Sequence, residues 1–458
     1  MTRTGLVAFR LCVGLSGIVW VEAAATEPLT AEGAVKLALQ RNSQVIGAEA
    51  AVLDARSGLY GAYSGVLPRL NGSVTRSGQW QQERTGAQVF GGFVSPIDRS
   101  DYEDFSTLPS LDGSWSVLNF SSLTGLLSAR NGLQAAQFQR RATRQDAALA
   151  TRREFYEVVK AVRLAQVAAG ALHLAHDDER RVRALFEVGS VSKSDLLKAQ
   201  LRTAQSVLDS LTARQAVINQ RILLARQLGL KESEMQEVDT LLIAEPREYD
   251  ETSLLAEARR IRPDLLAADA ELRAARTGLR SANLLRMPYV TLGGGLTYRP
   301  KSAFKVTTFD TSGVPLPAPL VEAGNSKDDL QYNARISLNW DLFTGLATES
   351  RIAAAQARLV RAKDGYDALD RNLQSEIHQA LLAYREATER EQVARSAVES
   401  ATENLKLTQE KYNVGSATIL ELIDAQVQLQ RAQSDIVSAL AAIRVAEAQV
   451  DRVRGRAE

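Results

Sequence analysis

Two hydrophobic patterns alternate along the chain, one with the period of a helix and the other with the period of a strand. The helical pattern is clearest between about Thr348 and Tyr412, where apolar residues recur at alternating steps of three and four, as in the seam of a coiled coil. These residues are Ile352, Ala355, Leu359, Ala362, Tyr366, Leu369 and Leu373. A helix over this region would extend about 100 Å at 1.5 Å per residue. No proline falls between Pro109 and Pro246 or after Pro319, so both regions are predicted to hold long helices.

The strand pattern is an alternation of apolar and polar residues, which predicts strands with one face of each kind. Between Leu330 and Trp340 every second residue is apolar. Val290, Leu292, Leu296 and Tyr298 alternate in the same way with Thr and Gly. A fainter alternation predicts an outgoing strand with Leu70, Val74 and Trp80 and a returning strand with Trp115, Val117, Leu118 and Phe120.

We therefore expect one strand pair at about 68–120 and a second at about 288–341. Gln81 to Leu111 and Lys301 to Asp329 are rich in Gly, Ser, Pro and Asp. Those residue types favour turns, so both stretches are predicted to be external loops.

One short stretch occurs twice and predicts a sharp reversal between two helices. The copies are Val188–Asp195 and Val414–Glu421, each followed by an Ala-Gln pair. Gly189 and Gly415 suit the left-handed conformation that ends a helix. The tips of two helical hairpins are therefore expected at 188–192 and 414–418.

The residues after each glycine suit the start of the next helix. Ser192 and Thr418 each offer a hydroxyl to the free backbone N–H groups of a first turn. Glu421 follows Thr418 at the capping-box spacing, and Asp195 follows Ser192 in the same way.

The chain is an internal duplication. The segment 55–59 recurs 220 residues later as 275–279, and the prolines, the strand ends and the tips follow in the same order. Similarity that holds its register over so many positions predicts two repeats. We assign them to 26–245 and 246–458, each a helix, a strand pair, a long helix, a tip and a helix.

The first 25 residues are typical of a secretory signal peptide, with Arg3 and Arg10, an apolar core and Ala23-Ala24-Ala25 as the cleavage site. Cys12, the single cysteine of the 458 residues, belongs to this leader, so no disulfide or thiolate chemistry is expected in the mature chain. Removing the leader leaves equal numbers of basic and acidic residues. A neutral protein is a poor candidate for nucleic-acid binding.

After the leader, no stretch approaches the roughly 20 apolar residues of a membrane-spanning helix, so a membrane protein would have to use its strands. Two-faced strands about ten residues long also match an outer-membrane barrel, although a soluble sheet with one wet face would alternate as well. The export signal and the duplication favour the membrane. Four strands cannot close a barrel and open edges do not persist in lipid, so three protomers supplying twelve strands are expected.

In this order of elements the sequence resembles the TolC-like outer-membrane efflux and secretion channels. The resemblance covers essentially the whole mature chain and rests on the leader, the duplicated units, the segment Leu338–Gly345 and the tips Phe186–Ser190 and Tyr412–Ser416. It implies an α+β membrane protein: a homotrimer with a 12-stranded outer-membrane barrel and a long periplasmic helical barrel. An equatorial belt would come partly from Lys231 to Thr252 and from the C-terminus.

The resemblance also assigns roles to residues at the tips. Carboxylates at Glu421 and Asp424 would line the closed periplasmic entrance as cation-attracting rings, and Asp195 occupies the related position of the first tip. Such rings are a recurrent selectivity device, while plain helix capping is the alternative for Glu421 and Asp195. Tyr412 and Phe186 would fasten neighbouring hairpins or simply pack.

The two tips themselves match the positions that periplasmic adaptors grip in this family, or they are turns and nothing more. Their residues are Val188, Gly189, Ser190, Val414, Gly415 and Ser416. Some relatives carry an arginine two residues after the second tip glycine that ties hairpins together. This chain has Ala417 there, so its closed state is expected to be latched differently.

No catalytic constellation, cofactor motif or metal site is evident. His173 and His176 are one helical turn apart, and His378 is the third histidine, but no third metal ligand accompanies the pair. We expect a passive outer-membrane exit duct for small toxic compounds, partnered by an adaptor and an inner-membrane pump. The exit duct of a type I protein-secretion system is the alternative, and a periplasmic adaptor or structural coiled coil is the alternative of a different class.

Overall fold

The computed structural model describes residues 28–83, 87–90, 93–96, 99–243, 247–300, 302–309, 314–315, 320–325 and 327–456. The predicted leader, including Cys12, lies outside these residues. The chain forms two compact units. Among the described residues, the tip unit comprises those up to Ala38 and within Thr151–Ala244 and Glu391–Ala441, and the sheet unit comprises those within Leu39–Ala150, Glu245–Arg390 and Ala442–Glu458.

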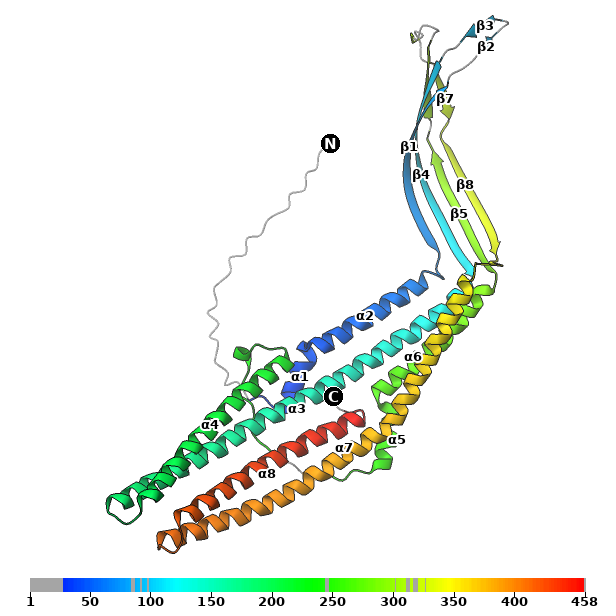
Figure 1. Ribbon diagram of the computed structural model, residues 1–458. Helices are drawn as coiled ribbons and strands as arrows, with labels where there is room; N and C mark the ends of the chain where they lie inside the picture. Colours follow the sequence, from blue (N-terminus) through cyan, green and yellow to red (C-terminus); the bar gives the residue numbers. More distant parts are fainter. Residues whose placement is uncertain are drawn as a thin grey trace, which may run out of the picture. The chain divides into compact units, whose positions relative to one another are not determined.

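Helices make up most of the described chain (Figure 1). They are α1 Ala31–Arg41, α2 Ser43–Tyr63, α3 Phe120–Glu187, α4 Lys193–Leu228, α5 Glu251–Ile261, α6 Pro263–Asn283, α7 Ala347–Asn413 and α8 Ile419–Val453, with 3₁₀ turns η1 Glu232–Glu234 and η2 Leu284–Arg286. The predicted long helix after Thr348 is confirmed, because α7 runs unbroken for 67 residues. Its counterpart α3 has 68.

Sequence signals explain where several of these helices begin and end. Gly229 adopts a left-handed conformation (φ 67°) and ends α4. Arg262 is extended and separates α5 from α6, and Pro263 occupies the first position of α6, where its missing N–H costs nothing. Asn42 caps α2 by accepting a hydrogen bond from the backbone N–H of Gln44, 2.8 Å away.

Four antiparallel strands form the main part of the sheet, in the order β1-β4-β5-β8 (Figure 1). They are β1 Arg69–Glu83, β4 Arg99–Leu118, β5 Tyr289–Arg299 and β8 Asp329–Asn339. Both predicted strand pairs are therefore present, as β1–β4 and β5–β8. The two pairs also join into one sheet, because β4 pairs with β5. Within the described residues, β1 and β8 each have one strand partner.

The prediction of loops at Gln81 to Leu111 and Lys301 to Asp329 is wrong for much of both stretches. β1 continues to Glu83 and β4 begins at Arg99. The smaller strands are β2 Ala87–Phe90, β3 Phe93–Pro96, β6 Ser302–Phe309 and β7 Leu320–Asn325, with β6 pairing β4 and β7. The end of β1 and the first half of β4 are rich in polar residues, and because a backbone ladder needs no apolar side chains, these parts lack the alternation pattern.

The proline in β4 fits this pairing. Pro109 faces Val74 of β1, but the pairing of β4 with β5 starts only at Ser110 and its pairing with β6 ends at Glu103. Pro109 thus lies where β4 has a neighbour on one side alone, a position that tolerates a missing donor.

The alternating residues do share a face, as predicted. Leu111, Leu296 and Tyr332 lie opposite one another on β4, β5 and β8, and so do Trp115, Leu292 and Ile336. A bulge between Ser116 and Leu118 explains why Val117 and Leu118 are apolar in succession. This apolar face is exposed in the isolated chain: Leu70, Val74, Tyr332, Ile336 and Leu338 are each at least 72% exposed.

One helix corrects the expectation that no segment resembles a membrane span. Part of α3 contains an 18-residue window that is long and apolar enough to cross a membrane by length and composition. A single such helix is weak evidence, because core helices of soluble proteins pass the same test.

Candidate functional site

The two hairpin tips have the same backbone construction. Gly189 (φ 78°) and Gly415 (φ 77°) are left-handed, as predicted. The N–H of Gly189 donates to the carbonyl of Phe186 (2.9 Å), and that of Ser190 donates to Leu185 (2.8 Å). The second tip has the same pair of hydrogen bonds, donated by the backbone N–H groups of Gly415 and Ser416. The pattern is a Schellman motif, which satisfies the last carbonyls of α3 and α7.

The second helix of each hairpin begins with a hydroxyl that bonds twice to the residue three positions on. The Ser192 hydroxyl accepts from the backbone N–H of Asp195 (3.2 Å) and donates to its carboxylate (2.8 Å). The Thr418 hydroxyl does the same with Glu421 (3.3 and 3.0 Å). In a capping box the carboxylate would accept the backbone N–H of the cap, so this arrangement is a variant of the predicted one.

Asp195 is the more strongly held of these carboxylates. The Ser192 hydroxyl, together with Lys198 at 3.3 Å, holds the pKa of Asp195 below its usual range. Glu421 and Asp424 are exposed on α8, and Asp424 makes no hydrogen bond or ion pair with the described residues. Glu421 and Asp195 therefore both contribute to helix caps, whereas Asp424 takes no part in a cap.

The predicted tip contacts are solvent-exposed in the single chain. Val188 and Val414 are 75% and 79% exposed, although both are apolar. Gly189, Ser190, Gly415 and Ser416 are also exposed. Exposed apolar side chains on hydrogen-bonded turns suit recognition by another protein.

The two predicted fastening aromatics differ in their surroundings. Tyr412 packs against a cluster formed by Val182, Ala199, Ile419 and Leu422, so it joins the α3–α4 hairpin to the α7–α8 hairpin within the tip unit. Its hydroxyl is buried without a hydrogen-bond partner among the described residues. Burial, together with the charges of Asp178 and Asp195, raises the pKa of Tyr412. Phe186 is 37% exposed and is not part of this cluster.

Sequence reasoning missed the polar contacts beside Tyr412. The Gln426 amide donates to the Asp178 carboxylate, and Arg202, which is 8% exposed, donates to Gln430 at 2.8 Å. Burial raises the pKa of Asp178 despite the Gln426 hydrogen bond and nearby Arg181. Gln426 belongs to one of the repeated Ala-Gln pairs, which was the only signal available, but its partner lies 248 residues away in the sequence.

The expected belt segments are anchored in the structure. The backbone N–H of Arg247 donates to the Tyr384 hydroxyl at 2.7 Å, and Tyr249 packs edge-on against the same ring. At the C-terminus, a Cβ on Gly455 would lie 3.2 Å from the Cα of Arg262. Gly455 therefore packs tightly on the corner between α5 and α6.

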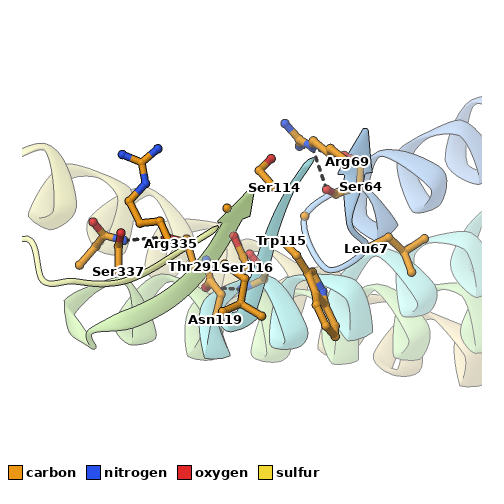
Figure 2. Close-up of a pocket in the computed structure, with 15 residues that line it drawn as sticks. Ser64, Leu67, Arg69, Ser114, Trp115, Ser116, Asn119, Thr291, Arg335 and Ser337 are labelled. Carbon is orange, nitrogen blue, oxygen red and sulfur yellow. Dashed lines mark hydrogen bonds between the residues drawn. The ribbon is translucent and has the colours of Figure 1, made fainter. Parts of the chain in front are cut away.

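A polar pocket of about 460 Å³ lies where the strands meet the helices of the sheet unit (Figure 2). Two arginines and a set of hydroxyl and amide side chains line it, together with Leu67, Trp115 and Leu292, and none of its lining residues is acidic.

Two of the three histidines each lie beside a single carboxylate. His173 lies 3.5 Å from Asp177 and His378 lies 3.4 Å from Glu251. No group of three potential metal ligands occurs among the described residues.

Comparison with known proteins agrees with this geometry. Residues 34–230 and 254–456 match the family described as "Outer membrane efflux protein". The chain is similar to the outer membrane protein TolC of Vibrio cholerae, with 24% identity over 363 residues, which is 76% of each chain. The CmeC outer membrane channel of Campylobacter jejuni has a similar fold, with TM-score 0.74, 17% identity and coverage of 93% of this chain and 86% of that one. VceC of Vibrio cholerae has TM-score 0.72, 18% identity and coverage of 93% and 96%.

The chain therefore belongs to the outer membrane efflux protein family, and the resemblance to TolC-like channels is confirmed. It is an outer-membrane protein whose helical part lies in the periplasm, and its fold is that of a channel.

Proposed function

We propose that three copies of this chain form the passive exit duct of a tripartite efflux system that expels small toxic compounds. The observation that carries the proposal is the four-stranded main part of the sheet, with one exposed apolar face and β1 and β8 as its edge strands. Unpaired edges are not tolerated in lipid. Because β1 and β8 run in opposite directions, β8 of one copy can pair antiparallel with β1 of the next, and closure removes every edge.

Three copies would supply twelve main strands, an even number as in bacterial outer-membrane barrels. The apolar face would then contact lipid and the polar face would line the lumen. The count of three comes from the resemblance to TolC-like channels. Mass photometry of the purified protein tests it: a trimer is expected, and a monomer would contradict the proposal.

At the periplasmic end, Asp424 would line the narrow opening, with Glu421 and Asp195 as neighbours. Its support is that Asp424 is exposed and makes no hydrogen bond or ion pair within the part of the chain that the structure describes. Symmetry would repeat each carboxylate three times, and a carboxylate ring attracts cations. Tyr412 would fasten the two hairpins in this closed state, with Phe186 in a lesser role, and Ala417 cannot supply the arginine latch of some relatives.

Conductance in planar bilayers tests the ring. Asp424→Ala, alone and with Glu421→Ala, should lower cation selectivity and weaken block by divalent cations. Asp435→Ala is the matched control, because Asp435 is exposed on the same helix and lies three turns further from the tip. Unchanged selectivity and block in the Asp424 and Glu421 variants would refute the ring, and equal effects in the Asp435 control would refute its location.

The tips would be the adaptor-binding surface, through Val188, Gly189, Ser190, Val414, Gly415 and Ser416. Their exposed valines support this assignment. Val188→Asp with Val414→Asp should abolish binding of the adaptor while leaving the trimer intact. Retained binding would contradict it.

The same duct could serve a type I protein-secretion system, because cargo is selected by the inner-membrane partner. Crosslinking in cells with a tagged chain, followed by identification of the captured transporter, separates the two: an efflux pump is expected, and an ABC transporter of a secretion operon would favour secretion. The division into repeats at 26–245 and 246–458 remains a prediction.

A further inference from the structure

We propose that the polar pocket at the base of the sheet binds small soluble anions that carry a phosphate or carboxylate group. It lies at the strand–helix junction, within the sheet unit, and is lined by β1, β4, β5 and β8 together with the residues that follow α2 and the start of α3. The inference rests on the proposed function for one point alone, that this polar face lines the channel.

One row of paired residues across the sheet forms the floor of the pocket. Arg69 of β1 lies opposite Ser114 of β4, Ser114 lies opposite Gly293 of β5, and Gly293 lies opposite Arg335 of β8. Residues opposite one another in a sheet point to the same face. Figure 2 shows Arg69, Ser114 and Arg335 on one side of the strands and Trp115 pointing the other way.

Gly293 leaves the gap in that row. A Cβ on Gly293 would approach no atom closer than the carbonyl oxygen of Gly113 at 4.0 Å, so the space above it is open. The next row up offers a contrast: a Cβ on Gly295 would lie 2.5 Å from the Asp112 carboxylate. There an acidic side chain covers the glycine, whereas the gap over Gly293 is unfilled.

The groups around the gap are hydrogen-bond donors. The row toward the helices consists of Ser116, Thr291 and Ser337, each with a hydroxyl that can donate. The Asn339 amide already donates to Thr291 at 3.2 Å, which leaves the Thr291 hydroxyl proton for another acceptor. A guanidinium beside several hydroxyls matches the geometry that phosphate and carboxylate oxygens require.

The two arginines differ in how far they are already committed. Arg69 donates to the carbonyl (3.2 Å) and hydroxyl (3.4 Å) of Ser64, so it also ties β1 to the end of α2. Arg335 is exposed and makes no hydrogen bond or ion pair with the described residues. Asp112, the acidic neighbour one row above, accepts from Ser110 at 3.1 Å. Arg335 is therefore the direct anion ligand, and Arg69 adds its charge from across Ser114.

Equilibrium dialysis of radiolabelled inorganic phosphate against the purified full-length protein in detergent tests the pocket directly. Arg335→Gln should weaken binding about tenfold or more, the loss expected for one charge-assisted hydrogen bond. Gly293→Val should weaken it similarly, because it fills the gap without altering any charge. Arg335→Lys should retain part of the affinity.

Arg286→Gln is the matched control. Arg286 lies close in sequence to β5 but pairs with Glu349 at 2.9 Å and does not line the pocket. It should bind phosphate like the unmodified protein. Equal losses in Arg286→Gln and Arg335→Gln, or full binding by Gly293→Val, would overturn the proposal.

Two further measurements separate the possible failures. Adding phosphatidylglycerol should leave phosphate binding unchanged, and competition would assign the pocket to a lipid headgroup instead of a soluble anion. In planar bilayers, phosphate should reduce single-channel conductance at constant ionic strength, and Arg335→Gln should remove that effect. Absence of any channel would refute the proposed function while the dialysis result stands on its own.

Discussion

Replacing Arg262 by methionine tests how much the charged cluster at the α5–α6 corner contributes to stability. Arg262 is 2% exposed and its Nη2 lies 2.8 Å from Asp264 and 2.5 Å from Glu376. Arg452 approaches the same two carboxylates at 3.6 Å and Asp146 at 2.8 Å. The cluster thus joins α3, α6, α7 and α8 inside the sheet unit.

The loss of stability in Arg262→Met depends on which charges remain beside Asp264 and Glu376. Removing one partner of a buried ion pair costs about 3–5 kcal/mol when the other charge is left uncompensated. Here Arg452 stays beside both carboxylates, and Glu376 is 39% exposed, so we expect about 2–3 kcal/mol. Burial disfavours the charge of Arg262, but Asp264 and Glu376 outweigh this effect and raise the pKa of Arg262.

Thermal unfolding followed by circular dichroism measures the effect, with Arg259→Met as the control. Arg259 pairs with Asp370 at 3.1 Å but is 53% exposed, and exposed pairs contribute about 0–1 kcal/mol. Arg262→Met should unfold at a clearly lower temperature than Arg259→Met, with faster hydrogen exchange in α5, α6 and the end of α8. Equal melting of the two variants would show that the buried pair only breaks even with an apolar side chain, which would refute the reasoning.

Four further substitutions probe local features. Gly415→Ala should destabilise its tip by about 1–2 kcal/mol, because alanine is strained in the left-handed region. Gly365 is helical and has open space where a Cβ would lie, so Gly365→Ala should stabilise α7 by about 0.5–1 kcal/mol. The two variants should shift the melting temperature in opposite directions, and shifts of the same sign would contradict this. Ser192→Ala should cost about 1 kcal/mol and accelerate hydrogen exchange in the first turn of α4, and unchanged exchange would mean that water replaces the cap. Burial raises the pKa of Glu447 despite Arg444 nearby, so the folded state holds a proton that the unfolded state has lost, and stability should fall as pH rises from the usual carboxyl range through this raised pKa. Glu447→Gln should flatten the melting temperature across that window, and an unaltered slope would assign it to other groups.

The sequence by itself determined the features that arise from neighbouring residues. The left-handed glycines at 189 and 415, the hydroxyl caps and the continuous α7 depend on conformational preferences within a few positions. The two-faced strands β5 and β8 could be predicted for the same reason, since alternation is a local pattern. The polar ends of β1 and β4 lacked that pattern, so sequence reasoning took them for loops.

Only the tertiary structure decided which distant residues meet. Asp178 reaches Gln426 across 248 positions, and the row from Arg69 to Arg335 depends on β4 pairing with β5. Nothing in the sequence distinguishes Arg262 from an ordinary surface arginine, yet it is almost fully buried. Such partners are selected by how helices and strands pack, because burial and pairing energies depend on distances in space. Local propensity carries no information about which of many similar arginines, glutamines and serines will lie within a few ångströms of one another.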